Sequence, residues 1–255
     1  MLRRGTELHD ADGPTLERHL IAANRIEFDS GDWHQEIYPM AHISCFSLLA
    51  LILVSPGALR AQAAADSGAF LIRHRADTVA TEQFTRTATR LEGTLSFRNP
   101  KGTSERYSAV IAPDATIPLI EVTVREGADT GKMRSRIVQR ARVIFKADSA
   151  AVDEVGSAGL VTRVLSTEEG AVPYLNLSFA LLEQAVRRAR LANGGVRVAF
   201  FNLGGGQTLT ARISPMAADS LQLDIGDTRI LLRLDPQGRV LAARIPAQDV
   251  VVERR

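Results

Sequence analysis

An alternation with a period of two residues runs through most of this chain and limits what it can fold into. From Phe70 onward, short segments rich in Val, Ile, Thr, Phe and Leu are separated by turn clusters such as Asn99-Pro100-Lys101-Gly102. Successive side chains of a β-strand point to opposite faces of a sheet, so this period predicts half-buried antiparallel strands. The turns are short, which favours pairing between strands that are neighbours in the sequence.

The alternation predicts strands in two halves of the chain, about residues 68–166 and 195–254. In the first half we expect strands at 70–75, 79–87, 90–97, 107–111, 117–124, 132–146, 151–155 and 160–165. In the second half we expect them at 196–202, 207–213, 220–225, 229–234, 240–245 and 250–253.

The period changes once, between the two halves. Apolar residues there recur at spacings of three and four, which predicts an amphipathic helix over about 176–192; they are Leu175, Phe179, Leu182, Val186 and Ala189. Asn176 or Ser178 can cap its start, and Asn193-Gly194 supplies a left-handed end. The predicted fold class is mainly β, with this one central helix and antiparallel strands in two sheets or in one strongly curved sheet or half-barrel.

Residues 132–146 show the clearest alternation. Basic residues occupy even positions and apolar residues occupy odd ones, so one face of the strand is basic; the basic residues are Lys132, Arg134, Arg136, Arg140, Arg142 and Lys146. The segment is long for a single strand, and we expect a bulge near its middle. Two interpretations stay open. The basic face is neutralised by solvent and cross-strand acids such as Glu121, or it meets anionic lipid headgroups or an acidic partner, with an affinity that falls as salt rises.

Upstream of the strands, residues 43–54 form an apolar run without charge, followed by small residues. A secretory signal core has roughly 7 to 15 apolar residues, whereas a membrane-spanning helix needs about 20. We therefore expect residues 40–61 to be a signal peptide and residues 62–255 to be a periplasmic or secreted domain. Residues 1–39 are then an extension upstream of a start at Met40, or a disordered tail. If the signal is not cleaved, it is the domain's only attachment to the membrane.

Residues that common catalytic and metal sites require are scarce after residue 61. His74 is the only histidine there, and Cys45, within the apolar run, is the only cysteine of the chain. A serine triad would have to use His74 without a Gly-x-Ser-x-Gly motif, and zinc sites need several His or Cys ligands. Gly204-Gly205-Gly206 lacks the lysine of a phosphate loop and predicts a hairpin turn. The sequence predicts no catalytic residue, no metal and no cofactor.

Charge and the missing catalytic residues favour a binding or envelope-associated module over an enzyme. The formal net charge is only +2 and both signs are interspersed, which argues against nucleic acid as a partner. We expect an apolar or lipid ligand or an envelope protein, bound by the basic face of 132–146 together with Phe145, Phe179 and Leu182. Two alternatives stay open: a hydrolase in which carboxylates from separate loops converge, and a purely structural domain.

The order of the elements resembles that of uncharacterised exported bacterial proteins of the half-barrel type. Antiparallel strands and one capped helix are followed by strands ending in Leu234-Asp235-Pro236-Gln237-Gly238-Arg239-Val240 and Ile245-Pro246. The lipoprotein carriers of the Lol system share this architecture. The resemblance covers about residues 70–255 and implies a concave apolar surface that holds acyl chains or a partner. It assigns no functional residue.

Overall fold

The computed structural model describes residues 65–127, 134–191 and 196–255. The predicted signal peptide, the residues upstream of it and Lys132 lie outside these ranges. Within them the chain forms one sheet of 15 strands and one α-helix, α2. None of the helices in these ranges has both the length and the apolar character needed to cross a membrane.

The first half contains eight strands: β1 (Asp66–His74), β2 (Asp77–Arg86), β3 (Arg90–Phe97), β4 (Ser104–Val110), β5 (Leu119–Glu126), β6 (Arg136–Phe145), β7 (Ser149–Gly156) and β8 (Gly159–Ser166). The second half contains β9 (Val172–Tyr174), α2 (Phe179–Leu191), β10 (Val196–Asn202), β11 (Thr208–Ala217), β12 (Ser220–Ile225), β13 (Thr228–Leu234), β14 (Val240–Ile245), the 3₁₀ turn η1 (Pro246–Gln248) and β15 (Val250–Arg254). Every predicted strand is confirmed, as is the helix. Only β9 was missed, because three residues are too few to show a period.

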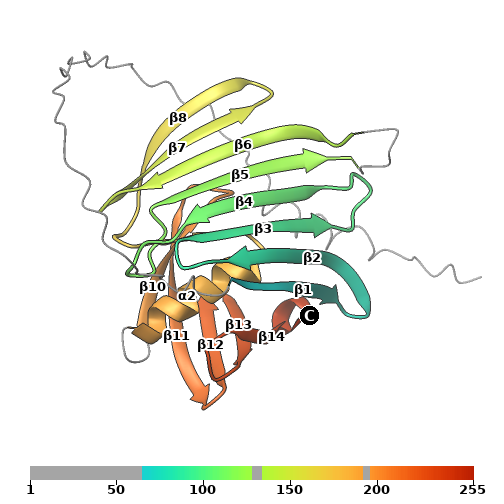
Figure 1. Ribbon diagram of the computed structural model, residues 1–255, viewed down its shortest axis with the longest axis vertical. Helices are drawn as coiled ribbons and strands as arrows, with labels where there is room; N and C mark the ends of the chain where they lie inside the picture. The colour runs from blue at the N-terminus through green and yellow to red at the C-terminus, as the bar shows by residue number, and fades with distance from the viewer. Residues whose placement is uncertain (1–64, 128–133, 192–195) are drawn as a thin grey trace, which may run out of the picture.

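The strands form two meanders that join into a single sheet. The spatial order is β8-β7-β6-β5-β4-β3-β2-β1-β15-β14-β13-β12-β11-β10-β9. All neighbours are antiparallel except β9 and β10, which run parallel. At the join, β1 pairs with β15 and places Ile72 opposite Val252. The prediction of one curved sheet is confirmed, and Figure 1 shows this sheet bending around α2.

Helix α2 fills the concave side of the sheet. The side chains of Phe179, Leu182 and Val186 are all less than 5% exposed. The ring of Phe179 packs 5.9 Å from that of Phe70 on β1, measured between centroids. Burying such side chains stabilises a fold by roughly 1.5–3 kcal/mol each. The protein's own helix therefore covers the concave apolar surface that we expected to receive a ligand.

Candidate functional site

A groove of about 530 Å³ lies on the outer face of β3 to β7, the face that points away from α2. Along β4 the side chains of Tyr107 and Ala109 point inward and are buried, whereas Arg106 is exposed. We call this the outer groove. Its outward-facing lining consists of Arg90, Glu92, Arg106, Ser108, Glu121, Thr123, Arg125, Ile137, Arg140, Arg142, Asp153 and Val155.

Strand pairing aligns one set of these residues into a cross-strand row. Arg106 lies opposite Thr123, Thr123 opposite Arg140, Arg140 opposite Val155, and Val155 opposite Leu160. Neighbouring strands are about 4.8 Å apart, so this arginine row extends for about 19 Å. Arg106 and Arg140 form no ion pair with any residue that the structure describes. Since Val155 is 47% and Leu160 68% exposed, the row changes from cationic to apolar along its length.

Two other arginines of the outer groove have acidic partners. Arg142 lies 3.7 Å from Glu121 on β5, and Arg90 lies 2.9 Å from Glu92 within β3. The predicted neutralisation by Glu121 is thus confirmed for Arg142. Exposed ion pairs of this kind contribute little to stability, typically about 0–1 kcal/mol.

The bulge expected in the long basic strand lies at Val138. Val124 pairs with Gln139 and the next residue, Arg125, pairs with Ile137, which leaves Val138 as an extra residue on β6. An extra residue moves the side chains on one side of it to the opposite face of the sheet. Ile137 consequently lines the outer groove, opposite Arg125, where an unbroken alternation would have placed Val138.

The bulge also divides the predicted basic face. Arg136 pairs with Glu126 and does not share the face of Arg140 and Arg142, which line the outer groove. The prediction that all six cations share one face is therefore wrong for Arg136. Of the other predicted residues, Arg134 and Lys146 are exposed beyond the two ends of β6, and Lys132 lies outside the described ranges.

The three predicted apolar contacts lie away from the outer groove. Phe179 and Leu182 belong to the core beneath the sheet. Phe145 is half-buried on the inner face, where its ring meets that of Phe201 edge-on at a centroid distance of 5.5 Å. The exposed apolar side chains next to the outer groove are instead Val155 and Leu160.

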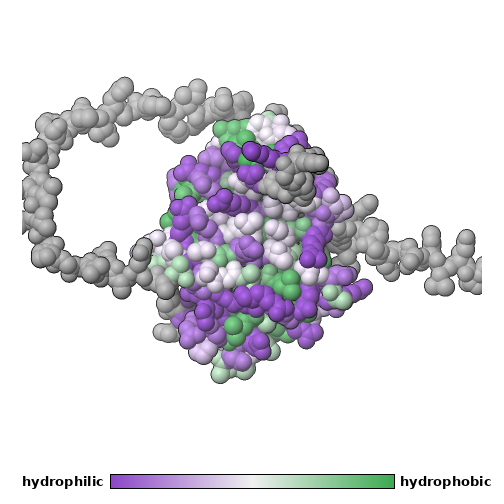
Figure 2. Space-filling view, turned by 45° about the vertical axis from the view of Figure 1, so that its right-hand side comes forward, coloured by the Kyte–Doolittle hydropathy of each residue, from purple (hydrophilic) through white to green (hydrophobic). Residues whose placement is uncertain are grey.

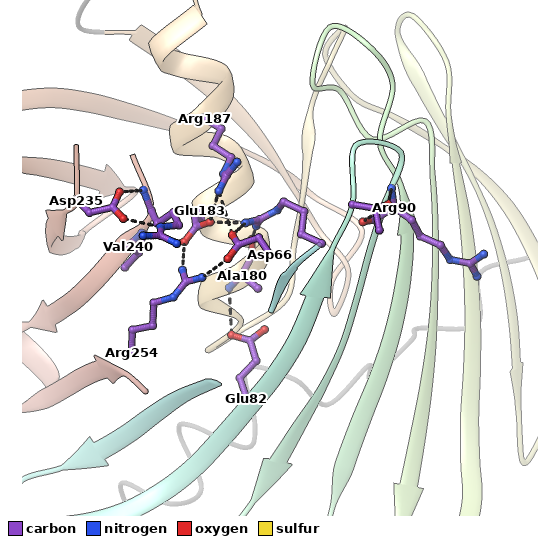
Figure 3. Close-up of polar contacts among 12 residues, drawn as sticks. Asp66, Glu82, Arg90, Ala180, Glu183, Arg187, Asp235, Val240 and Arg254 are labelled. Atoms are coloured by element: carbon purple, nitrogen blue, oxygen red, sulfur yellow. Dashed lines mark hydrogen bonds and ion pairs between the residues drawn. The ribbon is translucent and has the colours of Figure 1, made fainter. Parts of the chain in front are cut away.

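A second cluster of charged residues is buried where α2 meets the join between β1 and β15. Its centre is Glu183 of α2, which is fully buried and accepts hydrogen bonds from three arginines (Figure 3). They are Arg86 of β2, Arg187 of α2 at 3.1 Å and Arg254 of β15 at 2.8 Å. We call these four residues and Asp66 the seam network, because they connect both halves of the sheet to the helix.

Two further contacts complete the seam network. Asp66 of β1 lies 2.8 Å from Arg254 and 3.2 Å from Arg187. The backbone N–H of Val240 donates to Glu183 at 2.8 Å, at the end of a turn in which Asp235 accepts a 2.8 Å hydrogen bond from the N–H of Arg239. The turn that carried the sequence resemblance thus holds a donor for the buried carboxylate.

Burial dominates the electrostatics of the seam network. It lowers the pKa of Arg86, and the adjacent Glu183 carboxylate opposes this shift. Arg254 lies over the ring of Phe84, 5.0 Å from its centroid, a cation–π contact that shields the guanidinium from water. Since Arg86 is 4% exposed and Glu183 is not exposed at all, a substrate has no access to these charges. We infer that the seam network has a structural role, because it connects α2 to strands of both halves of the sheet.

The start of α2 is held by a buried carboxylate from the sheet. Glu82 of β2 accepts hydrogen bonds from the hydroxyls of Tyr107 and Ser178, both at 2.6 Å, and from the N–H groups of Phe179 at 2.7 Å and Ala180 at 3.1 Å. Ser178 also accepts a 3.4 Å hydrogen bond from the N–H of Leu181, which confirms the predicted cap. Burial raises the pKa of Glu82, and the four donors oppose that rise.

One sequence pattern could have revealed these buried charges. Glu82 and Arg86 occupy the same alternate positions of β2 as the buried Ala80 and Phe84. Glu183 lies four residues after Phe179, on the apolar face of the helix. Charged residues at inward positions need partners in the core, and the pattern leaves only the identity of those partners open.

The buried carboxylates also bear on the hydrolase alternative. Glu82 and Glu183 are both fully buried and already bonded to several donors, so neither faces a cleft that a substrate could enter. In residues 65–127, 134–191 and 196–255, no group of three or more His, Cys, Asp or Glu side chains is placed to hold a metal ion.

No known family description matches the chain, and no curated protein sequence does. The solved structures that are similar to it include the following two. A DUF1089 family protein from Pseudomonas aeruginosa is 14% identical with a TM-score of 0.49, over 68% of this chain and 92% of that one. A β-barrel-like protein of a domain of unknown function, DUF1849, from Brucella abortus is 9% identical with a TM-score of 0.45, over 74% of this chain and 95% of that one.

Proposed function

We propose that this protein is an exported module of the bacterial envelope that binds anionic lipid on the outer face of β4 to β8. The observation that carries this proposal is the arginine row, in which Arg106 and Arg140 are separated by one threonine and followed by exposed Val155 and Leu160. A lipid has the same sequence of parts, a charged headgroup joined to apolar chains.

The cationic end of the row suits a phosphate group. A guanidinium binds phosphate oxygens through two parallel N–H donors and keeps its charge at any physiological pH. Arg125 adds a third cation to the groove, with a 3.4 Å hydrogen bond to the Ser135 hydroxyl. The Thr123 hydroxyl lies between Arg106 and Arg140 in the pairing and can donate to the same headgroup.

The apolar end of the row is wider than two side chains. Val164 of β8 is 72% exposed. It lies on the same face of the strand as Leu160 and Thr162, since side chains two residues apart point the same way. Exposed apolar residues gathered at one place mark interaction surfaces more often than scattered ones do. Figure 2 shows one face of the molecule, on which hydrophilic side chains predominate.

Removing two arginines of the row should weaken lipid binding. The double variant Arg106→Ala, Arg140→Ala should bind vesicles of equimolar phosphatidylglycerol and phosphatidylcholine about 30-fold more weakly, since each Arg near an anionic surface contributes about 1 kcal/mol. Co-sedimentation with the vesicles measures this. The matched control, Arg233→Ala with Arg244→Ala, removes two exposed arginines from β13 and β14 and should bind like the unchanged protein.

Salt and lipid charge separate this proposal from its alternatives. Raising the ionic strength from 0.1 M to 1 M shortens the screening length from about 10 Å to about 3 Å and should release most of the bound protein. Vesicles of phosphatidylcholine alone should bind little. Equal binding by both double variants, or no binding to either vesicle, would contradict the proposal and favour a structural role.

Export can be tested on the same protein. If residues 40–61 act as a signal peptide, the protein recovered from the envelope fraction of its host should begin close to Ala61. Intact mass spectrometry measures the start directly. A protein that still contains residues 40–61 would show instead that the segment is retained as an anchor.

A further inference from the structure

Strand β8 ends the sheet with an open edge. In the strand order it has β7 on one side and no strand on the other among the described residues, and Figure 1 places it at the upper end of the sheet. All eight of its residues are exposed or partly exposed. Its last residue is nonetheless held in place, because the Thr208 hydroxyl donates to the Ser166 carbonyl at 3.4 Å. The edge is therefore positioned and accessible.

The two edge strands of the sheet differ in how well they are protected against pairing with another chain. β9, at the other end, is three residues long, contains Pro173 and is buried against α2 at Val172. Short length, proline and cover are the usual means by which proteins prevent an edge strand from pairing with another chain. β8 has none of them: it is eight residues long, it lacks proline, and Arg163 is its only charged residue.

We propose that β8 pairs antiparallel with β8 of a second copy, in a symmetric dimer that continues the sheet across the interface. A two-fold axis perpendicular to the sheet keeps equivalent faces on the same side, so the axis lies between the two strands, midway between the two copies of one residue. Thr162 lies near the middle of the strand, and pairing centred there uses most of its length.

Pairing centred on Thr162 is self-complementary. Leu160 lies opposite Val164 of the partner subunit, and this contact occurs twice because of the symmetry. Both side chains are more than two-thirds exposed in one subunit, and in the dimer they contact each other while staying on the outer face of the sheet. Arg163 lies opposite Val161 of the partner subunit, so like charges do not meet, whereas pairing centred on Arg163 would place two arginines opposite each other. This pairing does not rest on lipid binding.

A charged side chain at position 160 should separate the dimer. The protein in buffer without lipid should have twice the mass of one chain by light scattering after size exclusion, and Leu160→Lys should halve that mass. Leu160 is 68% exposed, so the change leaves the core intact, which far-UV circular dichroism checks. The control Met216→Lys alters an equally apolar, 59% exposed residue of β11 and should remain dimeric.

Cross-linking tests the register. Residues directly opposite in antiparallel strands have Cα atoms about 4.5–5.5 Å apart, within the range that a disulfide bridges. With Cys45 replaced by Ser, Thr162→Cys should therefore form a covalent dimer under oxidation. Leu160→Cys should not, because four residues of strand, about 13 Å, separate the two copies of that position.

Two results would overturn the proposal. If the unchanged protein has the mass of a single chain, β8 does not pair with a second copy, and its open edge would instead be available to a strand of another protein. A dimer that persists in Leu160→Lys, without a cross-link at position 162, would place the contact between subunits elsewhere.

Discussion

Replacing Glu183 by alanine should lower the free energy of unfolding by about 3–5 kcal/mol, the largest effect we expect from any single substitution. The change leaves the buried Arg86 and its neighbours Arg187 and Arg254 with Asp66 as the remaining acid of the seam network. It also removes the acceptor of the Val240 N–H. A buried charge that loses its partner keeps the full cost of its removal from water, which is why the loss is large.

Urea unfolding followed by circular dichroism measures this effect. A chain of this size should lose about 10 °C in melting temperature for a change of that order. Glu121→Ala is the matched control, because Glu121 is an exposed acid whose single ion pair spans 3.7 Å. We expect it to cost less than about 1 kcal/mol. If both substitutions cost the same, the seam network does not stabilise the fold as we infer.

Replacing Gly93 by alanine should destabilise the protein by about 3 kcal/mol. Gly93 of β3 lies directly opposite Tyr107, and a Cβ atom built there would overlap the phenol ring. The absence of that Cβ lets the ring cross β3 so that its hydroxyl reaches Glu82 at 2.6 Å. Alanine adds the cost of overpacking, about 1–3 kcal/mol, and that of a lost buried hydrogen bond, about 1–3 kcal/mol.

Thermal unfolding of a matched pair of variants checks this mechanism. Gly156→Ala is the control, because a Cβ at Gly156 of β7 has no atom within 4 Å. We expect it to change stability by less than about 0.5 kcal/mol. Tyr107→Phe supplies a second test. If Gly93→Ala acts by displacing the Tyr107 hydroxyl, the two substitutions together should cost clearly less than the sum of their separate effects. Additive costs would contradict the mechanism.

The strands and the helix could be predicted from the sequence because each depends on a local period. Burial on one side of a sheet imposes alternation, and burial on one side of a helix imposes spacings of three and four. For that reason the predicted bounds of β3, β10, β12 and β14 coincide with those of the structure.

The site was harder to predict because it depends on pairing between strands. One extra residue, Val138, moves Arg136 off the face that Arg140 occupies, and the sequence indicates only that a bulge is needed somewhere in the segment. The arginine row likewise consists of residues from five strands, and its order exists only once their register is set. Phe179 and Leu182 were placed at the ligand because a concave apolar surface was expected to be open, whereas α2 covers it.

The pairing of β1 with β15 also has a consequence for the order in which the protein folds. Ile72 and Val252 face each other across the join, although nearly the whole described chain lies between them in sequence. Contacts between such distant residues form late, because a long loop must close before they are gained. During synthesis β1 is made first and β15 last. Until β15 is present, one edge of β1 has no partner strand and Glu183 lacks its hydrogen bond from Arg254. Folding of this domain should therefore be slow, and its final step should both close the sheet and add the last arginine to the buried acid.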